Sequence, residues 1–132
     1  MLRINRIKAI SRTESGKFGF DYSLSAGLNL ISSDENTKGK SSAILAIYYC
    51  LGLEEIIGGK GKKTLTSVYK TVVEGRDKGT YNVLESEAWL EISNGTDTVT
   101  IKRTAEMVNR NENLITVYHS NMDLAHDPKT FV

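Results

Sequence analysis

The sequence predicts an α/β fold with a mixed or antiparallel β-sheet, and three observations support this. Residues 2–10 and 18–24 alternate apolar and polar side chains with the period of a β-strand. An unbroken apolar run over 43–51 follows a polar loop and ends before a glycine, which is typical of a buried helix. Asn94-Gly95 separates two further alternating segments and indicates a hairpin. Strands interrupted by a helix predict layers of both kinds.

The expected elements follow one another along a single domain. The first two strands, 2–10 and 18–24, are close enough in sequence to form an antiparallel pair. The other expected elements are a short strand at 28–31, a helix starting near Lys40, a short helix at 64–73, and strands at 83–92, 99–101 and 114–118.

The composition excludes several classes of protein. The chain has 132 residues, 39% of them hydrophobic and 25% charged, which is ordinary for a globular domain and excludes extensive disorder. A formal net charge of +1 gives no overall basic footprint for nucleic acid. A single cysteine, Cys50, excludes an internal disulfide and fits the cytoplasm. No stretch is apolar enough for a signal peptide or a membrane span, so no membrane contact is expected.

The polar loop before the helix carries the motif with most chemical content. Residues 34–41 read DENTKGKS, which matches the end of the phosphate-binding P-loop pattern (Walker A), G-x-x-x-x-G-K-[ST]. Asp34 replaces the first glycine, and a carboxylate facing phosphates would be repelled, so its side chain is expected to point away. Gly39 allows the backbone to approach phosphates, Lys40 reaches their outer oxygens, and the Ser41 hydroxyl ligates Mg²⁺.

The expected ligands are therefore ATP and Mg²⁺. Backbone N–H groups of the loop and of the first helical turn converge where the helix dipole also favours an anion. The residues expected to contact the nucleotide are Asn36, Thr37, Lys38, Gly39, Lys40, Ser41 and Ser42, and Ser41 is the expected metal ligand.

The segment GLNLISSDENTKGKSSAILAIYYCLG (27–52) resembles the strand–P-loop–helix of SMC/RecF-type ATPases, which are ABC-type P-loop NTPases. Asn36 matches an asparagine found three residues before the second glycine in those families. VLESEAWLEISNGTDTVTIKRT (83–104) resembles a strand pair of the same lobe, which commonly ends in I-x-R, here Ile101-Lys102-Arg103. The non-glycine loop start is similar to large ATPases of bacterial anti-phage defence, such as the Lamassu type. The resemblance implies that residues 1–132 form the N-terminal lobe of an ATPase head.

The parts of a complete head that are missing are equally informative. The chain contains no glutamine, which leaves no glutamine loop, and no apolar run ends in Asp-Glu as a Walker B strand does. Residues 24–27, LSAG, look like the start of a signature motif, but they precede the P-loop and are interpreted as a chance match. The resemblance implies that these parts lie in a C-terminal lobe, so the chain is expected to be part of a longer or a split protein. No catalytic residue is expected here, and the chain alone should be inactive.

The resemblance also implies partners: the missing C-terminal lobe, a second head in an ATP-sandwiching homodimer, and DNA for the full-length protein. The implied roles are DNA repair, DNA maintenance or anti-phage defence. Two alternatives stay open: a nucleotide-sensing or scaffold module that never hydrolyses ATP, and a β-rich nucleic-acid-binding domain whose Gly-Lys-Ser is incidental. Outside the motif, Arg12 is either a nucleotide contact or a surface residue, and Trp89 is expected to be a packing residue.

Overall fold

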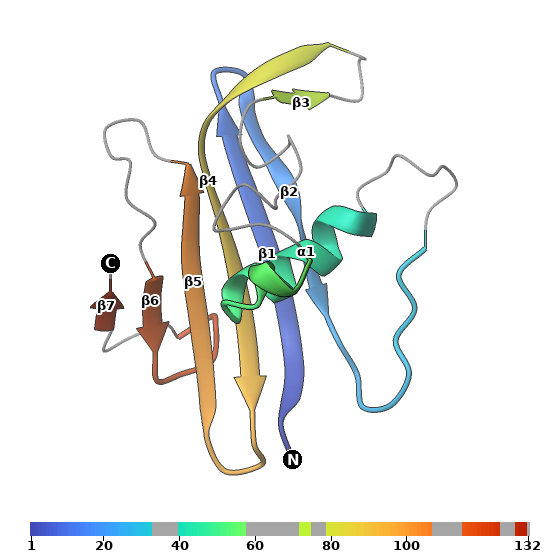
Figure 1. Ribbon diagram of the computed structural model, residues 1–132, viewed down its shortest axis with the longest axis vertical. Coiled ribbons are helices and arrows are strands. Elements are labelled where there is room, and N and C mark those ends of the chain that lie inside the picture. The colour runs from blue at the N-terminus through green and yellow to red at the C-terminus, as the bar shows by residue number, and fades with distance from the viewer. Residues whose placement is uncertain (33–39, 58–71, 75–78, 107–114, 125–128, 132) are drawn as a thin grey trace.

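The computed structural model describes residues 1–32, 40–57, 72–74, 79–106, 115–124 and 129–131. Its strands form one seven-stranded sheet, in the order β2-β1-β4-β5-β6-β7, with β3 paired to β4 beside this path (Figure 1). The elements are β1 (Arg3–Thr13), β2 (Gly16–Ser23), α1 (Lys40–Cys50), the 3-10 helix η1 (Glu54–Ile57), β3 (Val72–Glu74), β4 (Thr80–Ser93), β5 (Thr98–Glu106), β6 (Ile115–Tyr118) and β7 (Lys129–Phe131).

The predicted α/β class, a P-loop NTPase half-domain with a mixed or antiparallel sheet and a P-loop helix, is wrong, because the described residues form mainly strands. Every strand pair of the described sheet is antiparallel, and α1 is the one α-helix among the described residues. The strand expected at 28–31 is absent, because no described strand lies beside this segment to accept its backbone hydrogen bonds. Parallel pairing requires crossover connections, whereas β1–β2 and β4–β5 are joined by tight turns.

Local signals in the sequence located several elements correctly. The predicted pairing of the first two strands is confirmed, as are the helix that starts at Lys40 and the hairpin at Asn94-Gly95. Gly95 has a φ of 99°, a conformation that suits glycine in a tight turn. The short helix expected at 64–73 lies mostly outside the described residues, and its last part belongs to strand β3 instead.

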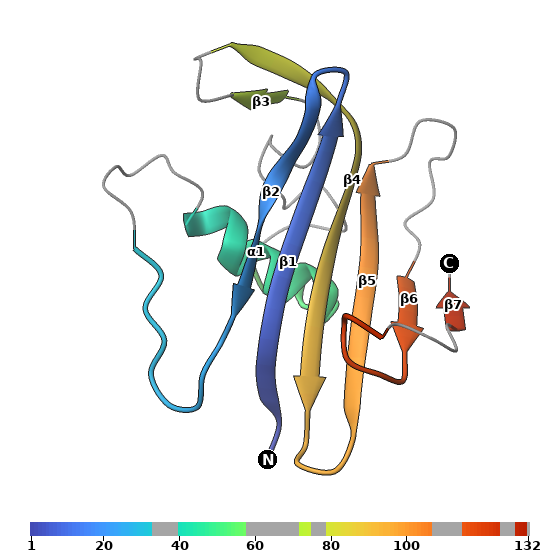
Figure 2. The same cartoon turned by 180° about the vertical axis from the view of Figure 1, so that it is seen from behind.

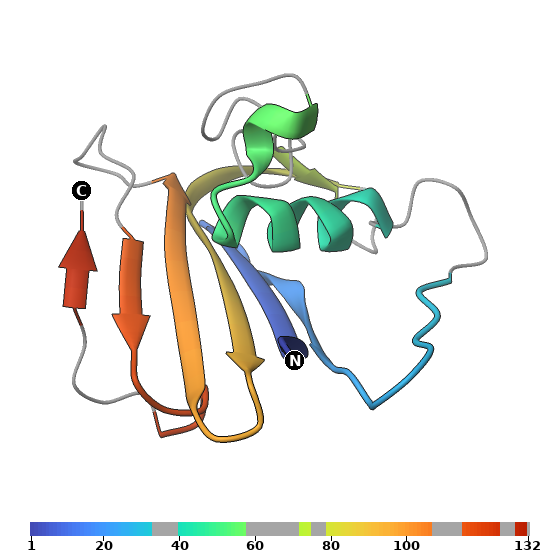
Figure 3. The same cartoon turned by 60° about the horizontal axis from the view of Figure 1, so that its bottom comes forward.

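Helix α1 lies across one face of the sheet, over β1, β4 and β5 (Figures 1 and 3). We call this the helix face, and the opposite side the open face. Between them, the helix and the strands bury one apolar cluster: Ile7, Ala9, Ala46, Tyr49, Cys50, Ala88, Leu90 and Ala105. The alanines on both surfaces keep the layers close, and the space that they leave is filled by the fully buried ring of Tyr49.

Tyr49 and Arg103 fix the C-terminal end of α1 to strand β5. The Tyr49 hydroxyl donates a hydrogen bond to the Thr104 carbonyl (2.8 Å), and the Arg103 guanidinium lies 4.0 Å from the centre of the Tyr49 ring. Arg103 Nη1 also donates to the Tyr49 carbonyl (2.7 Å), one of the last carbonyls of the helix. A cation at this position satisfies a helix-end acceptor and complements the negative end of the dipole.

The predicted consequence is that replacing Arg103 loosens the helix from the sheet. We expect Arg103→Met to lower the free energy of unfolding by about 2–3 kcal/mol, because the Tyr49 carbonyl loses a charged donor in a buried position. Urea denaturation followed by circular dichroism measures the change. Arg3→Met, at an exposed position of β1, is the matched control and should change stability little. Equal unfolding free energies for Arg103→Met and wild type would contradict this role.

Candidate functional site

The Gly-Lys-Ser motif ends at the start of α1. Lys40 is the first helical residue, and the side chain of Ser41 in the first turn is exposed. Ser42 is buried beneath the helix, with 7% of its surface accessible. Ser41 is therefore free of packing constraints and available to a ligand, whereas Ser42 belongs to the protein interior. The remaining expected contacts, Asn36, Thr37, Lys38 and Gly39, lie outside the described residues, as do Asp34 and the Lys40 side chain.

The chemistry of this helix start fits an anion with a bound divalent cation. The first turn of α1 contains no acidic side chain, so nothing there opposes the field of the N-terminal N–H groups. An exposed serine hydroxyl is a suitable oxygen ligand for Mg²⁺ beside phosphates. Arg103 holds the C-terminal end of α1 over the sheet. The N-terminal end of α1, where the motif lies, points away from the centre of the sheet (Figure 1).

The segment before the loop does not supply the strand that a P-loop normally follows. The Leu28 and Leu30 side chains are 96% and 86% exposed. Asn29 instead organises a local turn: its Oδ1 accepts the Ser25 N–H (2.9 Å), and its Nδ2 donates to the Ser25 carbonyl (2.9 Å). The motif therefore has its helix but lacks its preceding strand in the part of the chain that is described.

Arg12, for which the sequence left open a nucleotide contact or a surface position, lies on the open face. Its neighbours Ser11 and Thr13 are buried on the helix face, so strand alternation directs Arg12 to the other side. There its guanidinium is 3.2 Å from a Glu87 carboxylate oxygen and 3.9 Å from one of Glu85. Arg12 is thus held in an ion-pair cluster across the sheet from α1.

Glu87 is the centre of that cluster. Its carboxylate is nearly buried and pairs with Arg12 (3.2 Å) and Lys102 (3.3 Å), which come from the two neighbouring strands. Burial acts to raise the Glu87 pKa, but Lys102, the indole N–H of Trp89 and Arg12 together hold the pKa below its ordinary value of 4.5. Glu87 therefore stays ionised, and its carboxylate is occupied by ion pairs within the sheet.

A second group on the open face was not recognised from the sequence. The Trp89 ring stacks on Tyr118, with 5.7 Å between ring centres, and the ammonium groups of Lys8 and Lys102 lie 5.6 and 5.1 Å from the Trp89 centre. Lys8 and Lys102 are the cross-strand neighbours of Trp89 in the register, and Tyr118 comes from β6, one strand further on. Local sequence patterns do not give such contacts. Trp89 is a packing residue, as expected, but the side chains that pack on it are two lysines and a tyrosine ring.

The segment after β6 folds back over β5 on the open face (Figure 2). The Met122 N–H donates to a Glu91 carboxylate oxygen (2.9 Å), and the buried Thr100 hydroxyl donates to the Ser120 carbonyl (2.9 Å). Arg6 extends this arrangement, since it pairs with both Asp21 on β2 and Asp123 in the segment (2.8 Å to Asp123). The open face is therefore a structural ionic surface along most of its length.

The described residues contain neither a cluster of metal ligands nor a membrane-spanning helix. No group of three or more His, Cys, Asp or Glu side chains among them could hold a metal ion. Helices in the same part of the chain are all too short or too polar to span a membrane. In comparisons with known proteins, no family model, no curated sequence and no solved structure matches this chain.

The Glu87 cluster predicts a defined acid dependence of stability. The contribution of a carboxylate whose pKa is lowered by folding is complete above its unfolded value, here 4.5, and is lost as the pH falls through the folded pKa. We expect Glu87→Gln to lower the unfolding free energy by about 1–2 kcal/mol at neutral pH, with the difference from wild type vanishing in acid. Urea titrations across the acid range measure this. Glu85→Gln, at a more exposed carboxylate, is the control; an equal effect there, or a pH-independent one for Glu87→Gln, would argue against the cluster.

Proposed function

We propose that this chain binds Mg·ATP at the loop before α1, as the ATP-binding part of an SMC/RecF-like ATPase. The observation that carries the proposal is the start of an 11-residue helix at Lys40, directly after the motif glycine in the sequence. A helix N-terminus without acidic side chains favours phosphate, and a lysine and an exposed serine in its first turn are the residues that phosphate and Mg²⁺ require. The antiparallel fold adds no support, so the proposal depends on the motif and the helix alone.

Each residue has a specific task in this proposal. Loop residues 36–39 supply backbone N–H groups to the phosphates, and Lys40 provides a charged contact to the terminal ones. The exposed Ser41 hydroxyl ligates Mg²⁺, which supplies charge neutralisation between the phosphates. Ser42 contributes its backbone N–H at most, since its side chain is buried.

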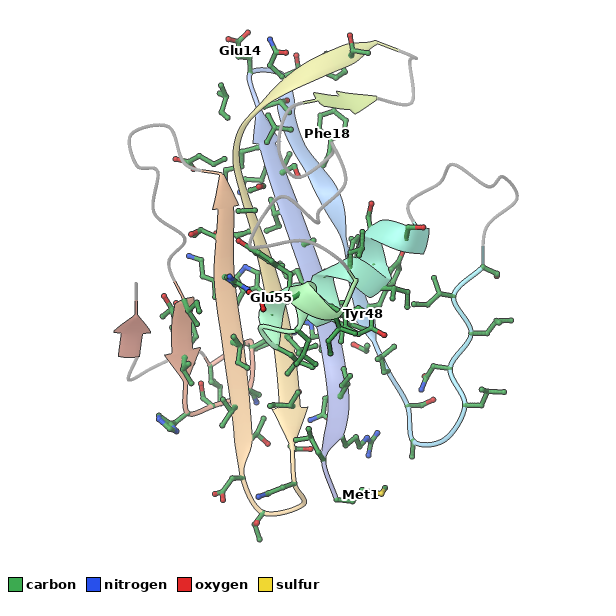
Figure 4. The ribbon with its side chains drawn as sticks, viewed as in Figure 1. Met1, Glu14, Phe18, Tyr48 and Glu55 are labelled. Carbon is green, nitrogen blue, oxygen red and sulfur yellow. The ribbon has the colours of Figure 1, made fainter. Side chains whose placement is uncertain are left out.

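Hydrolysis requires carboxylates, and those whose side chains the structure describes do not lie at the start of α1. Phosphoryl transfer to water needs one group to orient the water and a second to support Mg²⁺. Glu85 and Glu87 lie on the open face and pair with Arg12, across the sheet from α1. Glu55 is exposed on η1, which follows the far end of the helix near Tyr48 (Figure 4). We therefore propose that the catalytic groups come from a second lobe.

Exposed apolar side chains support the existence of such a lobe. Leu28 and Leu30 precede the loop, Ile44 lies on the outward side of α1, and Ile56 on η1 is 72% exposed. A helix that is apolar on all sides normally packs against more than one layer. In the proposal, the C-terminal ATPase lobe covers these side chains, two heads enclose ATP in a homodimer, and the full-length protein acts on DNA in the cytoplasm, in repair, maintenance or anti-phage defence.

The first prediction from this proposal concerns Lys40. Lys40→Ala should weaken binding of Mg·ATP tenfold or more, since a charge-assisted contact to phosphate contributes about 1.5–3 kcal/mol. Titration with a fluorescent ATP analogue measures the dissociation constant. Lys8→Ala, which removes a lysine of the open face, is the matched control and should bind normally. If wild type and Lys40→Ala bind equally, or neither binds, the assignment of the loop is wrong.

The second prediction is that the purified chain releases phosphate from ATP only at background rate. Addition or fusion of a C-terminal lobe with Walker B and signature motifs should produce turnover that Lys40→Ala abolishes. A phosphate-release assay measures both states. Turnover by the chain alone that is lost in Lys40→Ala would show a catalytic carboxylate within it. ATP binding without turnover even in the presence of the lobe would favour a nucleotide-sensing module.

A further inference from the structure

Strand β2 is the edge of the sheet, and it is the most exposed of the longer strands. It pairs with β1 on one side, and no described strand pairs with its other side. Six of its eight residues are exposed, and only Phe18 and Phe20, which face the helix side, are partly covered. Figure 4 marks Phe18 on this strand, near the turn at Glu14. An eight-residue strand with a free backbone edge and no proline is competent to pair with another strand.

The side chains along this edge form a self-complementary pattern. On the open face, Lys17 and Asp21 have opposite charges and are separated symmetrically by Gly19. On the helix face, Phe18 and Phe20 flank the same glycine. If two copies pair antiparallel with Gly19 opposite Gly19, then Lys17 of each faces Asp21 of the other, and Phe18 faces Phe20. Shifting the centre to residue 18 or 20 leaves both charges without an opposite partner.

The two charged residues are available for this pairing. Lys17 is exposed and forms no ion pair within the described part of its own chain. Asp21 accepts hydrogen bonds from Arg6, which keeps the pKa of Asp21 low and orients the carboxylate, yet 40% of its side chain remains accessible. A carboxylate has lone pairs for more than two donors, so Asp21 can accept a further bond from a second chain.

Gly19 suits the centre of such a pair. A Cβ there would lie 2.0 Å from the Ala9 carbonyl oxygen, so the position requires glycine. Gly19 also borders an open surface hollow of about 350 Å³ that Lys8, Ile10, Lys17 and Asp21 help to line. This hollow provides room for the Lys17 and Asp21 side chains of two chains to meet across the two-fold axis.

We propose that two copies of this chain associate through their β2 strands, antiparallel and centred on Gly19, to form one continuous sheet. Because residues of equal parity face one another, the two-fold axis is perpendicular to the sheet, and both α1 helices lie on the same side. This contact uses residues of β2 alone and needs neither ATP nor a second lobe. Main-chain hydrogen bonds provide the association, and the Lys17–Asp21 pairs fix the register.

Charge reversal tests this geometry directly. Lys17→Asp places two carboxylates opposite each other at both ends of the pair, and Asp21→Lys places two ammonium groups there, so each variant alone should dimerise about tenfold more weakly than wild type. An equimolar mixture of the two variants restores both opposite-charge contacts and should form a heterodimer. Sedimentation equilibrium at low salt, with one variant labelled, measures all three states, and high salt should reduce the differences.

The controls are Arg3→Asp and Asp97→Lys, equal charge changes away from β2, whose mixture should gain nothing over the separate variants. If Asp21→Lys unfolds, mixtures of Lys17→Asp with wild type decide the matter, because they should bind with an affinity between the two homodimers. A monomeric wild type at high concentration, or a dimer indifferent to Lys17→Asp, would overturn the proposal. If Lys40→Ala loses ATP binding but still dimerises, the β2 proposal stands. A failure of the β2 proposal can therefore be distinguished from a failure of the proposed nucleotide site.

Discussion

The contact between Tyr49 and Arg103 is the interaction on which the arrangement of the rest depends. An antiparallel sheet needs a cover on at least one face, and in the described structure α1 is the cover that buries the apolar side of β1, β4 and β5. The helix shows no polar stripe that would fix its rotation, because apolar residues occur all around it. Its orientation is instead set at one end, where Arg103 bonds the Tyr49 carbonyl and stacks on the ring.

This anchoring separates the chemistry of the two faces. Alternation along β1 sends Ile7 and Ala9 towards the helix and Lys8 and Arg12 away from it. On the open face, Arg12 pairs with the Glu87 carboxylate and Lys8 lies over the Trp89 ring. The charges of these cations are therefore balanced within the chain. Arg12 and Lys8 therefore lie across the sheet from α1.

Local sequence signals predicted the parts of the fold that depend on local interactions. The alternation of β1 and β2, the Asn94-Gly95 turn and the apolar run of α1 all act over a few residues, and these elements were located correctly. The fold class was missed because the mixed sheet required residues 28–31 to pair with a strand distant in sequence, and no local pattern specifies such a partner. The Glu87 and Trp89 clusters were missed for the same reason, since their members come from three and four strands, respectively, and meet only through the register. For the candidate site, the Gly-Lys-Ser motif predicted the helix start, but Asn36 to Gly39 lie outside the described residues and remain predictions.

The surfaces that this fold leaves unsatisfied differ in kind, and this difference bears on how the chain associates. Leu28, Leu30 and Ile56 are apolar and largely exposed, so covering them requires a broad layer that removes them from water. The edge of β2 instead offers backbone donors and acceptors with one basic and one acidic side chain, which suits a single added strand of matching pattern. A partner that covers the apolar side chains would bind mainly through the free energy of burying apolar area. A strand added at β2 would bind through backbone hydrogen bonds and charge pairs, which fix its direction and register.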